Sequence, residues 1–162
     1  MDFQIKVNET QGLEKVQSLI QNGVVNAPAD VISQTNALYM NTDILIKRMS
    51  AGIEKMITAW DGDRCVGAMS YMRTQVQDEN RVICSILFIY VDVAYRGQGI
   101  AGSMMKRCLL ECKNDNVFKL NMSARFSEKR LICLGINYGF RPEGFIDFNN
   151  EKFNTVLLGI RP

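Results

Sequence analysis

The residues best suited to chemistry form a glycine-rich stretch in the middle of the chain. Segment 91–102 passes from an apolar run into three closely spaced glycines, Gly97, Gly99 and Gly102, and then into an amphipathic pattern. Because glycine has no Cβ, the backbone N–H groups of such a loop can turn toward a ligand at close range. The first amides of a helix favour a negative group, and Arg96 adds a permanent cation. The stretch therefore predicts a phosphate site, and the alternative is a tight turn that needs glycine for geometry alone.

The chain contains no histidine, which removes both the commonest general base and the commonest transition-metal ligand. Serine–histidine and cysteine–histidine hydrolases are therefore excluded. Any chemistry must use carboxylates, tyrosine, serine, cysteine, water or backbone groups, or must need little proton transfer from the protein. The 5 cysteines show no paired CxxC spacing, so we expect buried free thiols in a reducing compartment and no metal site.

Composition indicates one domain over residues 1–162, because 47% hydrophobic residues are enough for a sizeable core. The 19 basic and 17 acidic residues give a net charge of +2, which offers no electrostatic case for nucleic acid or for an anionic membrane. The first residues lack the basic and apolar regions of a signal peptide, and no apolar run has transmembrane length. We therefore expect a cytoplasmic protein without a membrane partner.

The glycine stretch is placed between a strand and a helix. Residues 82–93 are almost continuously apolar, as in a central strand covered on both faces. Residues 100–113 show apolar side chains at helical spacing, with Cys108 and Cys112 on the apolar face. A turn at 114–116 then leads to a short apolar strand. These three elements predict a β-α-β unit with parallel strands.

The remaining elements follow from apolar periodicity and from capping and turn residues. Two hairpins and one further strand are expected, together with helices before the first hairpin and before the last. The expected elements are a strand at 3–7, helices at 10–23, 28–40, 41–52 and 127–138, a hairpin of 56–60 and 65–72, a loop at 73–81, and a hairpin of 144–148 and 153–160. This order indicates a mixed α/β (α+β) chain in which antiparallel hairpins flank one β-α-β unit.

With these elements in place, the chain resembles the GNAT superfamily of acetyl-CoA-dependent N-acetyltransferases over residues 54–141. The family pattern Arg/Gln-x-x-Gly-x-Gly/Ala is met by residues 96–101, which follow Tyr90-Val91-Asp92, and a later helix runs into Gly139-Phe140. The resemblance implies a GNAT-like fold. That fold has a central, mostly antiparallel, twisted sheet of about six to seven strands, one parallel β-α-β unit and flanking helices.

The resemblance also implies how acetyl-CoA, the co-substrate, would be held. Backbone amides of the loop would bind the pyrophosphate, and the backbone of Val91 and Val93 would bind the pantetheine arm. An amine would attack the thioester directly in a ternary complex, with an amide near Val91 polarising the carbonyl oxygen, and no metal is required. The loop residues concerned are Arg96, Gly97, Gln98, Gly99, Ile100, Ala101 and Gly102.

The chain departs from the family pattern where proton transfer is usually performed. The family tyrosine, four residues before Gly139, is replaced by Gly135, and the usual acid of the central strand is missing around Ser85. Tyr138 and Ser85 are the remaining weak catalytic candidates. For Tyr138 the competing interpretation is packing in the core, and for Ser85 it is a satisfied hydroxyl inside an apolar strand.

The resemblance therefore leaves two functional hypotheses. The first is an N-acetyltransferase that acts on a primary amine of a small molecule or peptide. The second is a coenzyme-A-binding or sensory module of the same fold without efficient catalysis. An acceptor carried by nucleic acid has no support from the charge balance, and whether the chain forms a homodimer is open. Phe145, Phe148 and Phe153 would line an apolar acceptor pocket or, equally, pack in the core.

Overall fold

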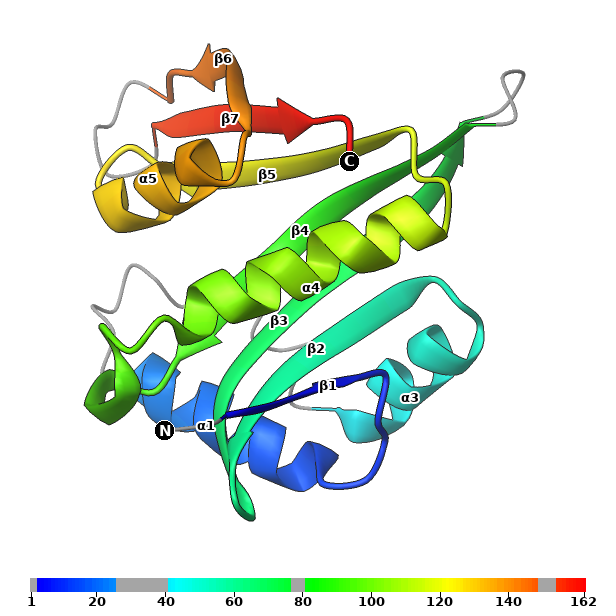
Figure 1. Cartoon of the computed structure of the whole chain (residues 1–162), viewed down its shortest axis with the longest axis vertical. Helices are drawn as coiled ribbons and strands as arrows, with labels where there is room; N and C mark the ends of the chain where they lie inside the picture. Colours follow the sequence, from blue (N-terminus) through cyan, green and yellow to red (C-terminus); the bar gives the residue numbers. More distant parts are fainter. Residues whose placement is uncertain (1–2, 26–40, 77–80, 149–153) are drawn as a thin grey trace. The chain divides into compact units, whose positions relative to one another are not determined.

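The computed structural model describes residues 3–25, 41–76, 81–148 and 154–162. Its strands form a seven-stranded sheet in the order β1-β2-β3-β4-β5-β7-β6, in which β4 and β5 are parallel (Figure 1). The pairs β1–β2, β2–β3, β5–β7 and β6–β7 are antiparallel. This arrangement confirms the predicted mixed α/β class with one β-α-β unit. The strands are β1 (Gln4–Val7), β2 (Glu54–Asp61), β3 (Arg64–Val76), β4 (Arg81–Val91), β5 (Lys119–Arg125), β6 (Arg141–Ile146) and β7 (Thr155–Ile160).

The chain divides into two compact units. The first unit takes its residues from 1–72 and 87–107, and the second takes its residues from 73–86 and 108–162. The prediction of a single domain over 1–162 stays a prediction. Within the described residues, no helix is both long enough and apolar enough to cross a membrane.

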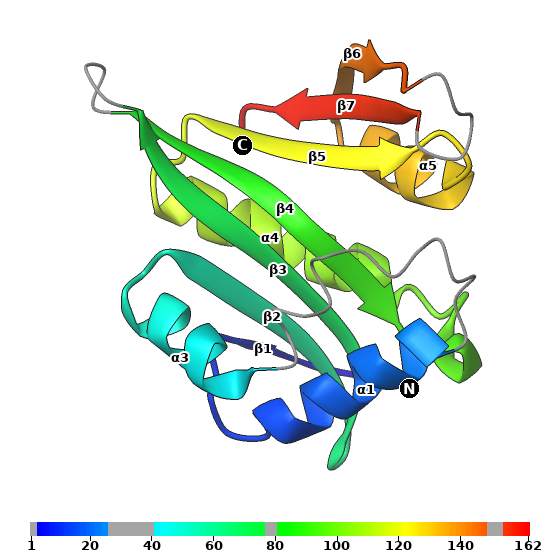
Figure 2. The ribbon, with the colours of Figure 1, turned by 180° about the vertical axis from the view of Figure 1, so that it is seen from behind.

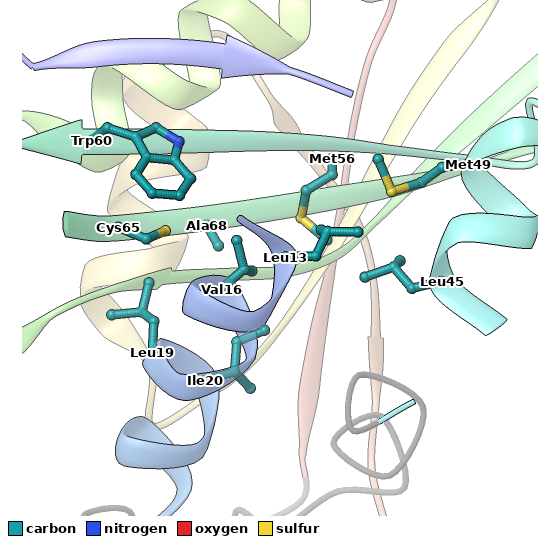
Figure 3. Packing of buried hydrophobic residues seen from close by; sticks show 10 residues of the cluster. All are labelled: Leu13, Val16, Leu19, Ile20, Leu45, Met49, Met56, Trp60, Cys65 and Ala68. Atoms are coloured by element: carbon teal, nitrogen blue, oxygen red, sulfur yellow. The ribbon is translucent and has the colours of Figure 1, made fainter. Parts of the chain in front are cut away.

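In the first unit, helices α1 (Leu13–Val25) and α3 (Thr42–Ser50) cover one face of the β1–β3 strands (Figure 2). Their apolar side chains recur at helical spacing and meet the alternate side chains of β2 and β3, so one cluster fills the interface. Asn41 begins α3 by accepting N–H bonds from Asp43 and Ile44, as an N-cap should. Figure 3 shows ten residues of the cluster: Leu13, Val16, Leu19, Ile20, Leu45, Met49, Met56, Trp60, Cys65 and Ala68.

The opposite face of the same strands carries the start of helix α4 (Ile100–Asn114). A Cβ added to Gly67 on β3 would lie 2.9 Å from Ile100 Cγ2 and 3.3 Å from the Cβ of Ala59. Gly67 therefore lets the first turn of α4 rest directly on β3, and Ile100 and Met104 are buried there. This contact fixes the helix end that follows the glycine stretch.

In the second unit, helix α5 (Lys129–Asn137) packs on the strands β5 and β7. A Cβ at Gly135 would collide with the methyl group of Met122 and would lie 3.2 Å from Leu158 Cδ1. The glycine thus allows a close approach of helix and strands, and a side chain at this position would require Met122 to move.

Several element boundaries differ from the sequence prediction. Helix α1 continues past Gly23, since one glycine costs a helix only about 1 kcal/mol. Strand β3 extends through 73–76, where a loop was expected, because strand pairing tolerates polar side chains. Helix α5 begins at Lys129, with Glu128 at its N-cap, and not at residue 127 as expected. The expected helix at 28–40, the turn at 149–150 and Phe153 lie outside the described residues.

Candidate functional site

The glycine stretch begins where β4 ends. Strand β4 stops at Val91, and residues Val93–Tyr95 form a short 3-10 turn, η2. The Oδ1 atom of Asp92 accepts the N–H of Ala94 at 3.0 Å, which caps the turn. The expectation that the strand continues to Val93 is wrong, because the strand ends two residues earlier, at Val91, and the capped turn begins at Val93.

Six consecutive backbone amides follow the turn without a hydrogen-bond acceptor among the described residues. The N–H of Arg96 donates to Val93 O at 3.4 Å, and the N–H of Ser103 donates to Gly99 O at 2.9 Å. Between them lie the amides of Gly97, Gln98, Gly99, Ile100, Ala101 and Gly102. The last three are the first amides of α4, which the helix itself leaves unpaired. The run can therefore accept an anion at the positive end of a 15-residue helix.

The backbone of the loop explains why glycine stands at two of these positions. Gly97 and Gly99 both have φ of +80°, a conformation that L side chains rarely adopt. A Cβ at either position would meet no atom within 4 Å, so the space beside the loop is open. The loop therefore combines unpaired donors with open space beside its two left-handed glycines, and such donors suit the anionic oxygens of the expected pyrophosphate.

Arg96 lies beside the end of β4. Its Nε donates to Val91 O at 3.0 Å, and its guanidinium carbon lies 5.6 Å from the centroid of the Tyr90 ring. No carboxylate among the described residues forms an ion pair with Arg96, which is exposed. The positive charge predicted for the loop is therefore present without a neutralising partner in this part of the chain.

The end of β4 also offers backbone groups to a ligand. The N–H of Asp92 donates to Val66 O on β3 at 2.9 Å. Because successive residues of an extended chain direct their backbone groups to opposite sides, the N–H of Val91 points away from β3. In the first unit, residues 87–91 form the outermost strand, and the pairing of β4 with β5 covers 83–85 only.

The tip of the β2–β3 hairpin contacts the turn that precedes the loop. Nη2 of Arg64 donates to Asp92 Oδ2 at 2.8 Å, and its guanidinium carbon lies 5.3 Å from the Tyr95 ring centroid. The Tyr95 hydroxyl donates to Asp61 Oδ2 at 3.0 Å, and this hydrogen bond raises the pKa of Tyr95. The aspartate–glycine signal of the hairpin is visible in the sequence, but the contact of its tip with the loop is not.

The two weak catalytic candidates lie in the second unit, whereas the glycine loop lies in the first. Ser85 is half-buried on β4, in parallel register with Asn121 of β5. Tyr138 is half-buried at the C-terminal end of α5. Their catalytic roles stay predictions. Gly135, in the place of the family tyrosine, is buried against β5 and β7 and brings no hydroxyl to this helix.

Three of the cysteines, Cys65, Cys84 and Cys112, are poor nucleophiles. Hydrogen bonding between thiols raises the pKa of Cys84 and of Cys112, and burial raises the pKa of Cys65 to about 11. These groups are neutral thiols at physiological pH. The expectation of buried cysteines is wrong for Cys133, which is exposed on α5 together with Ile136, three residues further along the same helix. Among the described residues, no cluster of acidic and cysteine side chains could hold a metal ion.

The terminal hairpin presents aromatic side chains to solvent. Phe145 and Phe148 are 53% and 56% exposed, so core packing does not account for them. Phe145 makes an edge-to-face contact with the exposed Phe126, with ring centroids 6.1 Å apart. Their role in an acceptor pocket stays a prediction.

The family model of the acetyltransferase (GNAT) domain matches residues 16–130, more than half of the chain. No curated protein matches the sequence. Among solved structures, an N-acetyltransferase from Staphylococcus aureus Mu50 is similar at 15% identity and a TM-score of 0.78, covering 99% of each chain. PaiA N-acetyltransferase from Thermoplasma acidophilum, in complex with coenzyme A, has 11% identity and a TM-score of 0.78 over 100% of each chain. Naa50 from Arabidopsis thaliana, in complex with the bisubstrate analogue CoA-Ac-MVNAL, has 17% identity and a TM-score of 0.71 over 99% of each chain. These structures share the fold, and the family match carries the assignment: the chain belongs to the GNAT family and is an acetyl-CoA-dependent acyltransferase.

Proposed function

We propose that this chain transfers the acetyl group of acetyl-CoA to a primary amine by direct attack in a ternary complex. The observation that carries the proposal is the run of six unpaired amides at 97–102, in the described part of a chain that belongs to an acetyl-CoA-dependent family. A pyrophosphate suits this run because its oxygens accept several N–H bonds at once and its charge meets the positive helix end.

The proposed pyrophosphate contacts come from residues 97–102, with the side chain of Arg96 as an additional cation. The backbone amide of Arg96 contributes less than the sequence predicts, because it already donates to Val93 O. For the pantetheine arm, Val91 is the better placed of the two predicted residues. Its N–H points away from β3, whereas Val93 lies in the η2 turn and its carbonyl accepts the Arg96 amide.

When bound, acetyl-CoA supplies a thioester whose carbonyl carbon accepts the amine. A carbon–nitrogen bond forms, the carbon–sulfur bond breaks and the thiolate of coenzyme A leaves. The proton that the amine nitrogen loses passes to water or to the departing thiolate. In this proposal the Val91 N–H stabilises the negative charge that develops on the carbonyl oxygen. The chain mainly holds and orients the two substrates, which is compatible with the absence of histidine.

The acceptor that we propose is an amine of a small molecule or a peptide. The complex of Naa50 with a peptide bisubstrate analogue supports a peptide acceptor within this fold. The complex of PaiA N-acetyltransferase with coenzyme A supports coenzyme A as a ligand of a chain with this fold.

Two measurements on the full chain test the proposal. Isothermal titration with coenzyme A should show saturable binding, and thiol release from acetyl-CoA should increase when a panel of small amines and peptide N-termini is added. Absence of binding at millimolar coenzyme A would overturn the proposal. Binding without turnover for any amine would favour the second candidate, a coenzyme-A-binding module, which the buried Gly135 in place of a tyrosine supports.

A further inference from the structure

The tip of the β2–β3 hairpin is tied to the glycine loop by more contacts than a surface turn requires. Asp61 and Arg64 face each other across a two-residue turn, in which Gly62 has φ of +56° at the position where a type II′ turn needs it. Lys15 of α1 donates to the carbonyl of Asp63 at 2.9 Å, so the tip is also anchored from its other side.

Asp92 uses its two carboxylate oxygens for two different purposes. Oδ1 caps the η2 turn at the Ala94 amide, while Oδ2 accepts from Arg64. Arg64 also lies over the ring of Tyr95, the last residue of the same turn. Arg64 therefore contacts both Asp92, which precedes η2, and Tyr95, which ends it. The unpaired amides of the loop begin two residues after Tyr95.

We propose that the hairpin tip is a positioning element for the phosphate loop, with Arg64 as its central residue. Arg64 holds Asp92 in the rotamer that caps η2, and it restrains Tyr95 together with Asp61. Both contacts fix the direction in which the chain enters residues 97–102. The inference rests on the proposed function of that loop as a pyrophosphate site.

The exposure of the Arg64 and Asp92 side chains distinguishes a role in positioning the loop from a contribution to folding stability. The side chain of Arg64 is 61% exposed and that of Asp92 is 21% exposed. Exposed ion pairs contribute little to folding stability. Loss of Arg64 should therefore change ligand affinity while leaving the melting temperature nearly unaltered, because the loop needs one particular arrangement of its amides to bind the anion.

The test compares Arg64→Gln, Arg64→Lys and wild type by isothermal titration with coenzyme A and by thermal melting. The control is Lys6→Gln, which removes another ion pair of the same unit, that of the half-buried Lys6 with the exposed Glu9 at 3.0 Å. Arg64→Gln should weaken coenzyme A binding about three- to tenfold, with a melting temperature within about 2 °C of wild type. Arg64→Lys should recover part of the affinity because it restores the charge, and the control should bind as wild type does.

A double-mutant cycle with Asp92→Asn identifies the route of the effect. Asparagine keeps an oxygen for the Ala94 amide but loses the charge that pairs with Arg64, so the two losses of affinity should not add. Full additivity would overturn the proposal, and so would wild-type affinity in Arg64→Gln. A wild-type chain that does not bind coenzyme A would overturn the proposed function itself, and this inference with it.

Discussion

Replacing Gly99 by valine tests the phosphate loop directly, and Gly52 offers a matched control. Gly99 has φ of +80° and Gly52 has φ of +68°, and at both positions an added Cβ would meet no atom within 4 Å. Each substitution therefore costs the strain of an L residue in a left-handed conformation, about 1–2 kcal/mol or more for a β-branched side chain. For a chain of this size, that loss lowers the melting temperature by about 2–8 °C.

The two variants should differ only in ligand binding. The valine at Gly99 occupies the open space beside the amides of 97–102, whereas Gly52 follows α3. Loss of a single charge-assisted N–H bond to phosphate costs about 1.5–3 kcal/mol, which is about ten- to 150-fold in affinity. Isothermal titration with coenzyme A, well below both melting temperatures, should show this loss for Gly99→Val and none for Gly52→Val. Equal affinity in the two variants would refute the phosphate role of the loop.

Three further predictions concern stability and reactivity. Glu54→Ala should lower the free energy of unfolding in urea by about 3 kcal/mol, because it leaves Arg48 without the buried carboxylate that its Nε contacts at 3.2 Å. An unchanged urea midpoint would contradict this. Gly135→Tyr should lower the melting temperature without raising the turnover number, because a Cβ there collides with Met122; a faster and equally stable variant would show that the helix can accommodate the ring. Ellman's reagent should titrate one thiol in the native chain, that of Cys133, and 5 after denaturation. A second fast native thiol would contradict the burial of the others.

The sequence predicts the glycine loop well because its signal is local. An apolar run, three glycines and an amphipathic pattern follow one another within a short stretch, and they predict a strand, a loop and a helix in turn. The parallel pairing of β4 and β5 follows from the helix between them. The family resemblance then supplies a ligand for the loop, and the unpaired amides at 97–102 are compatible with that ligand.

The features that the sequence does not predict depend on contacts between distant residues. Arg64 and Asp92 are 28 positions apart, and their contact depends on the β2–β3 register and on the exit angle of β4. The exit of Val93 from the strand depends on whether the Asp92 side chain caps or points to solvent, which a residue type alone does not decide. Similarly, the sequence around Gly135 does not indicate that a small residue is needed there, because this need comes from the side chain of Met122 beside it.

The loop 97–102 is restrained at two places, by the Asp92 cap before it and by Ile100 within it, which is buried against Gly67 on β3. The conformational entropy of ordering this segment is therefore lost when the protein folds and not when the ligand arrives. A ligand that meets an already ordered loop keeps more of its interaction free energy as affinity. The same linkage makes the ligand a stabiliser of the folded chain, since it binds a conformation that the unfolded chain does not contain.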